Sequence, residues 1–340
     1  MKPVCNPVSV DLAGRRALLH GATALLACAA LPLAPAALAS GYPDKPITII
    51  VPVSVGGPAD VMVRAMAQKM SERMGVPVTV DNKPGAGGLI ATEAGIRAKP
   101  DGYTILMINS GLVMMSATQP KNIRFDIHKD LQPITYAVRI PMAIMSNASA
   151  PFRTLDELVK YSKENPGKVS VGVTPGLGGS AHLALERMKL RDGMNAVAVP
   201  YKGSSLAVQA LLSNEVSVII DTLSGAAAQL EAGRLRGFAI LSESRSPRYP
   251  SIPTIGEAGF PGYGADTWNG FALAAGTPRE VVDRLHREIT TTIELPDVKS
   301  RVLAVGLEPA FNTPEQFAAN LRNGIELWTK VVRDAKLSFD

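Results

Sequence analysis

Cysteine is nearly absent from this chain of 340 residues. The two cysteines, Cys5 and Cys28, both lie within the first thirty residues, in a segment that has the features of an export signal. If that segment is removed, the mature chain holds no cysteine. It then has no disulfide, no thiolate metal site and no cysteine nucleophile.

Histidines and catalytic motifs are also scarce. Of the four histidines, three follow the export segment, at positions 128, 182 and 286, and they are widely spaced. A zinc site needs several such ligands close together. The chain has no G-x-S-x-G, H-x-x-x-H or P-loop motif. We therefore expect no metal, no cofactor and no enzymatic centre.

Neither charge nor apolar residues are concentrated in the way that nucleic-acid-binding or membrane-spanning proteins require. The net charge is +5, and basic residues are interspersed with acidic ones, without a basic stripe or an aromatic platform. Beyond the export segment, no apolar run reaches the roughly 18 residues that cross a bilayer. We expect no nucleic-acid partner and no membrane span in the mature chain.

Residues 1–39 have the three parts of a signal peptide. An early group of basic residues precedes a mostly apolar stretch, residues 17–31, and a small-x-small cleavage site that ends at Ala39. The basic residues are Lys2, Arg15 and Arg16. Cleavage near Ala39 predicts a periplasmic protein. It lowers the net charge from +5 to +3, because three basic and one acidic residue leave with the segment.

Two features leave details of this export open. Arg15-Arg16 resembles a twin-arginine signal but lacks the usual Ser or Thr before it, so the sequence does not separate the Sec from the Tat route. Leu25-Leu26-Ala27-Cys28 resembles a lipoprotein processing site. Lipid attachment is the less favoured alternative, because Leu26 fits poorly and the site at Ala39 lies where cleavage is expected.

Strand and helix patterns alternate along the mature chain. Short, β-branched apolar runs predict buried strands, and the stretches between them predict helices. Strands are expected at residues 47–51, 76–80, 103–108, 169–173, 196–199 and 216–220. Helices are expected at residues 58–74, 90–98, 181–189 and 205–214. This alternation predicts two α/β regions with parallel sheets and right-handed crossovers.

The helix after residue 57 carries a stripe of methionines on one face. They recur every fourth residue, at Met62, Met66, Met70 and Met74. A methionine stripe can form a binding surface, but this spacing favours a face packed on the core.

Three capping-box motifs mark helix starts further along the chain. They are Thr154-x-x-Glu157, Thr277-Pro278-x-Glu280 and Thr313-Pro314-x-Gln316. The last two predict C-terminal helices over residues 278–294 and 314–336.

Three glycine-rich turns follow predicted strands, at residues 53–60, 83–88 and 174–180. Ligands of open α/β sheets bind at the carboxyl ends of strands. A glycine turn that leads into a helix also leaves backbone N–H groups free for an anion. For any single turn, the simpler explanation is that glycine permits a tight turn. For residues 53–60 and 174–180 together, one from each α/β region, we favour a site for a carboxylate.

Polar and aromatic side chains near these turns have two interpretations each. Asp60 lies in the first turn of a helix, where the helix dipole stabilises a carboxylate, so a structural role is favoured. His182 lies at a similar place, and it hydrogen-bonds either a ligand or a neighbouring carbonyl. Asp221 ends a strand, where it either accepts a ligand donor or caps the next turn. Trp268 is either a cleft wall or a core residue.

Residues 176–181 also fit the dinucleotide pattern G-x-G-x-x-[GA]. That pattern requires an acidic residue at the end of the next strand. The strand ends instead at Val199-Pro200-Tyr201-Lys202, and we reject dinucleotide binding.

A series of short motifs runs through the whole mature chain. They are YPDKPI at 42–47, VP at 51–52, GG-x-x-D at 56–60, NKPGAGG at 82–88, PDGYT at 100–104, VPYKG at 199–203, PTI-x-EAG at 253–259 and AGTP at 275–278. Together they resemble the solute receptors of tripartite tricarboxylate transporters, often called Bug receptors. The sequence departs from the pattern at Val53-Ser54-Val55, where an aromatic-proline or aromatic-alanine run is commoner, and at Pro58-Ala59, where Gly or Ser and Thr are usual.

The resemblance implies a type II periplasmic-binding-protein-like α/β fold with mainly parallel sheets. Two domains are joined by two crossing segments, and the ligand cleft lies between them. We expect domain I at residues 40–140 and 265–340, domain II at residues 141–264, and a hinge near residues 136–145 and 264–271.

The resemblance also implies that backbone N–H groups and water hold the ligand. It assigns the ligand loops to Ser54, Val55, Gly56, Gly57, Thr174, Gly178, Gly179 and Ser180. The candidate site is completed by His182 and by Asp221, which corresponds to an aspartate that can face the ligand.

The resulting hypothesis is a monomeric periplasmic receptor for a small carboxylate. The ligand would be a di- or tricarboxylate, an aromatic carboxylate or a related organic acid, delivered to the membrane subunits of a transporter. A ligand sensor that acts on a signalling partner is the alternative. A periplasmic enzyme is less favoured, because no nucleophile–base pair is visible.

Overall fold

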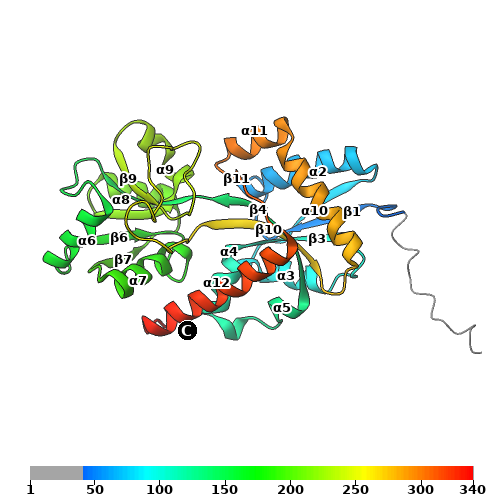
Figure 1. Ribbon diagram of the computed structural model, residues 1–340, viewed down its shortest axis with the longest axis horizontal. Helices are drawn as coiled ribbons and strands as arrows, with labels where there is room; N and C mark the ends of the chain where they lie inside the picture. The colour runs from blue at the N-terminus through cyan, green and yellow to red at the C-terminus, as the bar shows by residue number, and fades with distance from the viewer. Residues whose placement is uncertain (1–40, 340) are drawn as a thin grey trace, which may run out of the picture. The chain divides into compact units, whose positions relative to one another are not determined.

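The computed structural model describes residues 41–339. The predicted signal peptide, its cleavage site and both cysteines lie outside these residues. From Pro43 onward the chain forms one compact unit that contains two β-sheets with helices packed against them (Figure 1). Within the described residues, no helix combines the length and apolar character needed to cross a bilayer.

The first sheet has six strands in the order β11-β4-β10-β3-β1-β2. The strands are β1 (Ile47–Val51), β2 (Val78–Asn82), β3 (Thr104–Asn109), β4 (Leu131–Ile140), β10 (Thr267–Ala274) and β11 (Glu308–Pro309). Strands β2, β1 and β3 are parallel, whereas β10, β4 and β11 pair antiparallel to their neighbours. We call this sheet and the helices on it the first lobe.

The second sheet has five strands in the order β7-β6-β8-β5-β9. The strands are β5 (Met142–Asn147), β6 (Ser170–Val173), β7 (Val197–Pro200), β8 (Val218–Thr222) and β9 (Leu235–Ile240). Strands β7, β6 and β8 are parallel, and β5 pairs antiparallel with both β8 and β9. We call this sheet and the helices on it the second lobe.

The sheets are mixed, whereas the sequence predicts mainly parallel ones. The difference arises where the chain passes between the lobes, from β4 through Pro141 into β5 and later back into β10 (Figure 1). Met142 begins β5 opposite Thr222, at the carboxyl end of β8. A strand that enters a sheet from the carboxyl edge must run against the strands that end there. β10 returns to the first sheet in the same way, with Asn269 opposite Asn109 at the end of β3.

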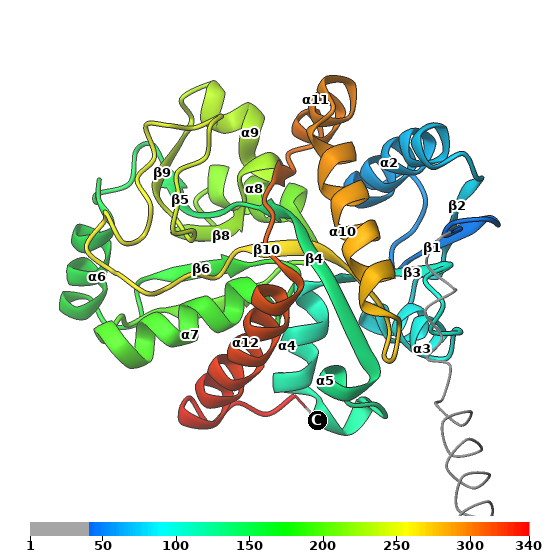
Figure 2. The ribbon, with the colours of Figure 1, turned by 45° about the vertical axis from the view of Figure 1, so that its right-hand side comes forward.

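Helices connect these strands and cover the sheets. They are α2 (Pro58–Met74), η1 (Ala86–Gly88), α3 (Leu89–Ile96), α4 (Ser110–Thr118), η2 (Pro120–Asn122), α5 (Ile127–Asp130), α6 (Leu155–Glu164), α7 (Ser180–Asp192), α8 (Ser204–Leu212), α9 (Leu223–Glu231), α10 (Arg279–Glu294), α11 (Pro296–Ala304) and α12 (Pro314–Asp334). The helix α12 lies against β4 and α4 in the first lobe and also contacts α7 of the second lobe (Figure 2).

The methionine stripe of α2 faces the core, as its spacing predicts. Met62, Met66 and Met70 are fully buried, and Met74 is 9% exposed. A fully buried side chain of this size contributes about 1.5–3 kcal/mol to folding, so the stripe anchors α2 on the first sheet.

Only one of the three predicted capping boxes forms completely. At the start of α12 the Thr313 side chain accepts from the N–H of Gln316, whose side chain accepts from the N–H of Thr313. Thr154 caps α6, but the Glu157 carboxylate binds the N–H of Arg153 instead. The box predicted at Thr277-Pro278-x-Glu280 does not form.

Pro278, not Thr277, is the N-cap residue of α10. Because its backbone is extended and has no capping side chain, α10 begins without a side-chain cap. The Thr277 hydroxyl instead donates to the carbonyl of Ala274.

Candidate functional site

The first predicted ligand loop, residues 53–60, follows the carboxyl end of β1 and includes the first residues of α2. Ser54, Val55 and Gly56 are exposed, and Val55 keeps 69% of its surface accessible. The helix α2 begins after Gly57 with no side-chain cap. Its first N–H groups therefore have no side-chain acceptor within the loop.

Asp60, in the first turn of α2, fixes the shape of this loop through hydrogen bonds. Its carboxylate accepts hydrogen bonds from the N–H of Gly56 at 2.9 Å, from Arg64 Nε at 2.9 Å and from Asn82 Nδ2 at 2.8 Å. Burial raises the pKa of Asp60, but these hydrogen bonds outweigh it and hold the pKa below the usual value. With both oxygens engaged, Asp60 has the structural role that the sequence favours.

The second predicted loop, residues 174–179, connects β6 to α7. Like α2, α7 begins after a glycine, Gly179, with no side-chain cap; unlike α2, it has no acidic residue in its first turn. Gly176 and Gly178 have φ angles of +91° and +81°, a conformation that side chains other than glycine rarely adopt. Thr174 and Ser180 are buried at the two ends of the loop.

His182 holds this second loop from within α7. Its Nδ1 accepts a hydrogen bond from the N–H of Gly178 at 3.1 Å. Burial lowers the pKa of His182, although Glu186 opposes this, which favours the neutral ring that such an acceptor requires. The ring also packs edge-on against Phe339. His182 therefore has a structural role in holding the loop, but its partner is a backbone N–H and not the carbonyl that the sequence predicts.

Asp221 lies at the carboxyl end of β8 and is 1% exposed. Its Oδ1 accepts from the Thr174 hydroxyl at 2.8 Å, the Ser204 hydroxyl at 2.9 Å and the Thr222 N–H at 2.7 Å. Its Oδ2 is buried and has no partner. Burial raises the pKa of Asp221, although these donors oppose the shift. Asp221 thus connects the loop after β6 to the start of α8, and its Oδ2 is buried with no hydrogen-bond partner among the described residues.

Two further residues at these edges were not predicted from the sequence. Ser204 opens α8 after Gly203 and donates a hydrogen bond to Asp221. Asn269 is 3% exposed at the start of β10, and its Nδ2 is buried without a partner. A sequence signal for Ser204 exists, because it is a polar residue that follows a glycine after a strand. No local pattern in the sequence marks Asn269.

The candidate residues lie at strand ends that the crossing strands bring to the facing edges of the two sheets. Asn269 of β10 pairs with Asn109 at the end of β3, and Met142 of β5 pairs with Thr222 at the end of β8. In the described part of the chain, no hydrogen bond or ring contact joins residues 54–57 to residues 174–180. The structure brings together Thr174 and Asp221, and Gly178 and His182, but not the two loops.

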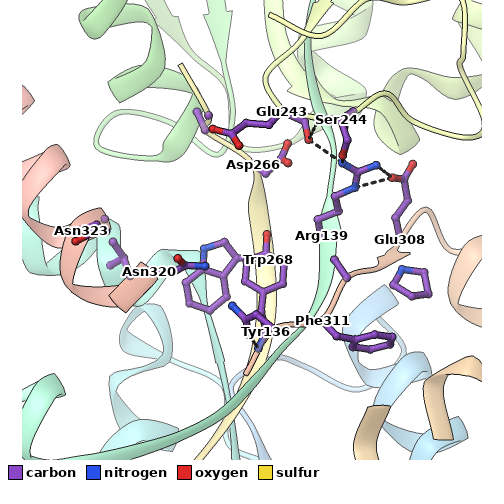
Figure 3. Close-up of a pocket in the computed structure, with 18 of the residues that line it drawn as sticks. Tyr136, Arg139, Glu243, Ser244, Asp266, Trp268, Glu308, Phe311, Asn320 and Asn323 are labelled. Atoms are coloured by element: carbon purple, nitrogen blue, oxygen red, sulfur yellow. Dashed lines mark hydrogen bonds and ion pairs between the residues drawn. The ribbon is translucent and has the colours of Figure 1, made fainter. Parts of the chain in front are cut away.

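A cavity with a volume of about 910 Å³ lies elsewhere, beside the crossing strands. Its walls come from β4, β10, β11, α4, α12 and the segment before β10 (Figure 3). None of the ten predicted site residues lines it. Trp268 does, with its ring 5.5 Å from that of Tyr136 and 5.3 Å from that of Phe317, so Trp268 is both a cavity wall and a packed aromatic residue.

An ion-pair network forms one side of this cavity. Arg139 of β4 contacts Glu308 of β11 at 2.6 Å and donates to the Ser242 hydroxyl at 2.8 Å and to the Arg245 carbonyl at 2.9 Å. The Ser246 hydroxyl donates to the other oxygen of Glu308. The network ties the segment after β9 to the edge of the first sheet.

The described residues contain no group of three or more His, Cys, Asp and Glu side chains arranged to hold a metal ion. The chemistry available at the facing edges is hydrogen bonding, by uncapped helix N–H groups and by the free oxygen of Asp221. Uncapped helix N–H groups suit the capture of an anion, and the Asp221 carboxyl group is the acidic group that this anion would also contact.

Comparison with known proteins identifies the family of this chain. The sequence profile described as "Tripartite tricarboxylate transporter family receptor" matches residues 62–337. Protein BugT of Bordetella pertussis is 34% identical over 87% of this chain and 91% of its own length.

Two solved structures are similar in both sequence and fold. R. palustris Rpa4515 with adipate is 29% identical, with a TM-score of 0.70 over 87% of this chain and 99% of its own. MatC from Rhodopseudomonas palustris with bound malate is 27% identical, with a TM-score of 0.65 over 86% of this chain and 100% of its own. These matches confirm the predicted fold class and a receptor rather than an enzyme. The chain belongs to the tripartite tricarboxylate transporter receptor family.

Proposed function

We propose that this receptor acts in the periplasm as a monomer, binds a small carboxylate between its lobes and delivers it to a tripartite tricarboxylate-type transporter. The observation that carries the proposal is that one strand-end loop in each lobe leads into a helix that starts after a glycine without a side-chain cap. Two related structures hold adipate and malate, which supports a dicarboxylate as the ligand class.

The proposed site consists of the loop residues 54–57 and 174–180, with Asp221 beneath the second loop. The first N–H groups of α2 and α7 would bind the carboxylate oxygens, because helix N-termini carry partial positive charge. Asp221 Oδ2 would meet a polar group of the ligand or a bridging water. His182 would contribute by holding the Gly178 N–H in place.

We propose that domain I comprises residues 40–140 and 265–340 and domain II residues 141–264, with closure by bending near residues 136–145 and 264–271. This proposal is supported by the strand pairing, since Ile140 and Thr267 lie opposite each other where the chain passes between the sheets. Closure would exclude water and strengthen each hydrogen bond to the ligand.

Calorimetry on protein that has been unfolded, stripped of ligand and refolded tests the ligand class. We expect at least one member of a panel of adipate, malate, citrate and benzoate to bind in a one-to-one complex. The matched amides and alcohols should not bind, because they lack the charge that the helix N-termini attract. Failure of every carboxylate to bind correctly refolded protein would contradict the ligand class.

Delivery is tested separately, in vesicles that contain the membrane subunits of the transporter. Uptake of the identified carboxylate should require the receptor and should rise with receptor concentration until the subunits are saturated. Uptake that is equal without the receptor would contradict delivery and would direct attention to sensing.

A further inference from the structure

The cavity beside the crossing strands is separate from the proposed carboxylate site. Its volume of about 910 Å³ lies within the range of small-molecule sites. It is bordered on one side by Glu243, Ser244 and Asp266 and on the other by Trp268, Asn320 and Asn323 (Figure 3). None of these residues belongs to the two ligand loops.

Arginine commonly binds anions, but Arg139 has no donor left for one. A guanidinium group has five N–H donors. Nε donates to Glu308, Nη1 donates to Ser242 and Ser244, and Nη2 donates to Glu308 and to the carbonyl of Arg245. The other basic side chain on the cavity wall, Lys299, pairs with Glu294 at 2.6 Å. The positive charges are therefore already neutralised.

The groups left over at this cavity are acceptors. Asp266 Oδ1 is buried and has no hydrogen-bond partner in the described part of the chain, while the Ser242 hydroxyl and the Met142 N–H bind the same carboxyl group. Glu243 is exposed, and no described residue pairs with it. Two carboxylates that form no ion pair within the described residues thus lie at the same end of the cavity (Figure 3).

The walls beside these carboxylates are aromatic. The rings of Trp268 and Tyr136 lie 5.5 Å apart and line the cavity together with Phe311. Aromatic faces attract organic cations, most strongly where water is excluded. The side-chain carbonyls of Asn320 and Asn323 add neutral acceptors for N–H groups.

We propose that this cavity is a second binding site and that it takes a small organic ammonium ion, such as an alkyl diamine. One ammonium group binds between Asp266 and Glu243, and the alkyl chain lies along Trp268 and Tyr136. The site follows from the buried Asp266 Oδ1, the exposed Glu243 carboxylate, neither of which has a partner among the described residues, and the aromatic wall beside them. It does not depend on the carboxylate site of the proposed function.

The pH dependence of binding gives the proposal a second test, because an ammonium ion favours the ionised form of Asp266. Burial raises the pKa of Asp266 to about 7. The groups that face Asp266 are the Ser242 hydroxyl, the Met142 N–H and Arg139, which lower this pKa, and Glu308, which raises it. Tyr136 also faces it, because the charge of Asp266 raises the pKa of Tyr136. An ammonium ion favours the ionised carboxylate, so binding should tighten as the pH rises through about 7.

The chain provides its own probe for the experiment. It contains two tryptophans, Trp268 and Trp328, and both line this cavity. Cadaverine is titrated into the ligand-stripped mature protein while tryptophan fluorescence is recorded, with calorimetry on the same sample. We expect a saturable change that a pentanediol of the same chain length does not produce.

The variants decide whether the named carboxylates hold the cation. Glu243→Gln and Asp266→Asn should each weaken cadaverine binding by about tenfold or more, since a hydrogen bond to a charged group is lost. Glu326→Gln, an exposed carboxylate of α12 that does not line the cavity, should bind as the wild type does. If the buried Asp266→Asn variant does not fold, the exposed Glu243→Gln variant still carries the test.

Three results would overturn the proposal. They are the absence of saturable cadaverine binding, an equal response to pentanediol, and an unchanged affinity in the Glu243→Gln variant. Carboxylate binding measured in the same samples reports on the other site, so failure of one proposal is distinguishable from failure of the other.

Discussion

Asp221 is the residue whose charge state a bound anion would change most. It is buried, burial raises its pKa, and its Oδ2 has no partner. A protonated carboxyl group can donate from that oxygen to an anionic ligand, whereas an ionised one would repel it. We infer that Asp221 binds a carboxylate in its protonated form.

This inference predicts a pH dependence with a definite sign. Affinity for a simple dicarboxylate should fall as the pH rises through the pKa of Asp221, which lies above the ordinary value of 3.8. Asp221→Asn should keep the affinity seen at low pH and lose the dependence. Its amide nitrogen replaces the O–H donor, and its amide oxygen keeps the contacts to Thr174 and Ser204.

Calorimetry over about pH 4 to pH 8 measures both proteins. Asp221→Ala serves as the second variant and should weaken binding by about tenfold or more at low pH. An Asn variant that retains the slope of the wild type would contradict the protonated form.

Asp60 makes a second prediction at this scale, on stability. Its folded-state pKa is lowered, so its stabilising effect is present above the pKa of the unfolded chain and is lost as the pH falls through the folded value. Asp60→Asn should lower the free energy of unfolding at neutral pH by about 1–3 kcal/mol and remove this part of the acid sensitivity.

Asp283→Asn is the matched control, because it breaks another Arg–Asp pair at a spacing of four residues. The Arg279–Asp283 pair is exposed on both sides, with side chains 63% and 47% accessible, and should cost about 0.5 kcal/mol or less. Urea unfolding of both variants measures the difference. Equal losses would show that the hydrogen bonds of Asp60 to Gly56 and Asn82 do not stabilise the loop.

Secondary-structure elements differ in how far local sequence determines them. The alternating elements before residue 109 follow from apolar periodicity, and β1 and α2 lie where the pattern predicts. The crossing strands β4 and β10 could not be predicted from apolar periodicity in the same way. β4 contains Pro133 and β10 contains Gly270, and both residue types argue against a strand. Space for a side chain at Gly270 is occupied by the ring of Phe317, with a carbon 2.5 Å from an ideal Cβ, a reason that only the folded chain contains.

Capping gives a prediction at the scale of elements. Thr313→Ala removes the side-chain acceptor of α12, so it should cost about 1 kcal/mol of stability. Thr313→Ser keeps the acceptor and should cost much less. Thermal unfolding of the two variants gives the comparison, and equal destabilisation would show that the methyl group of Thr313 matters more than its cap.

At the scale of the whole molecule, the candidate site remains a prediction in its ten residues, and the structure adds what connects them. The hydrogen bonds that Ser204 donates to Asp221 and that the Gly178 N–H donates to His182 could not be read from the sequence, because they depend on which strand ends lie side by side. The cavity beside the crossing strands also could not be predicted from the sequence. Its walls combine segments as distant in the chain as Val113 and Trp328.

Because the two lobes share one apolar core, we expect them to unfold together. One continuous cluster of buried apolar side chains includes Leu106 and Leu112 of the first lobe, Val171 and Leu185 of the second, and Leu321 of α12. Because α12 contacts both α4 and α7, separating the lobes would expose apolar surface on both. Such a shared core favours a single cooperative transition over two independent ones.

Scanning calorimetry of the ligand-free mature protein should therefore give one transition whose calorimetric and van't Hoff enthalpies agree. Leu321→Ala should lower its midpoint, at a cost of about 2–5 kcal/mol for a buried leucine, without dividing it. A bound carboxylate should raise the same midpoint as its concentration increases. Two resolved transitions, with only one moved by Leu321→Ala, would mean that each lobe has a core sufficient to fold without the other.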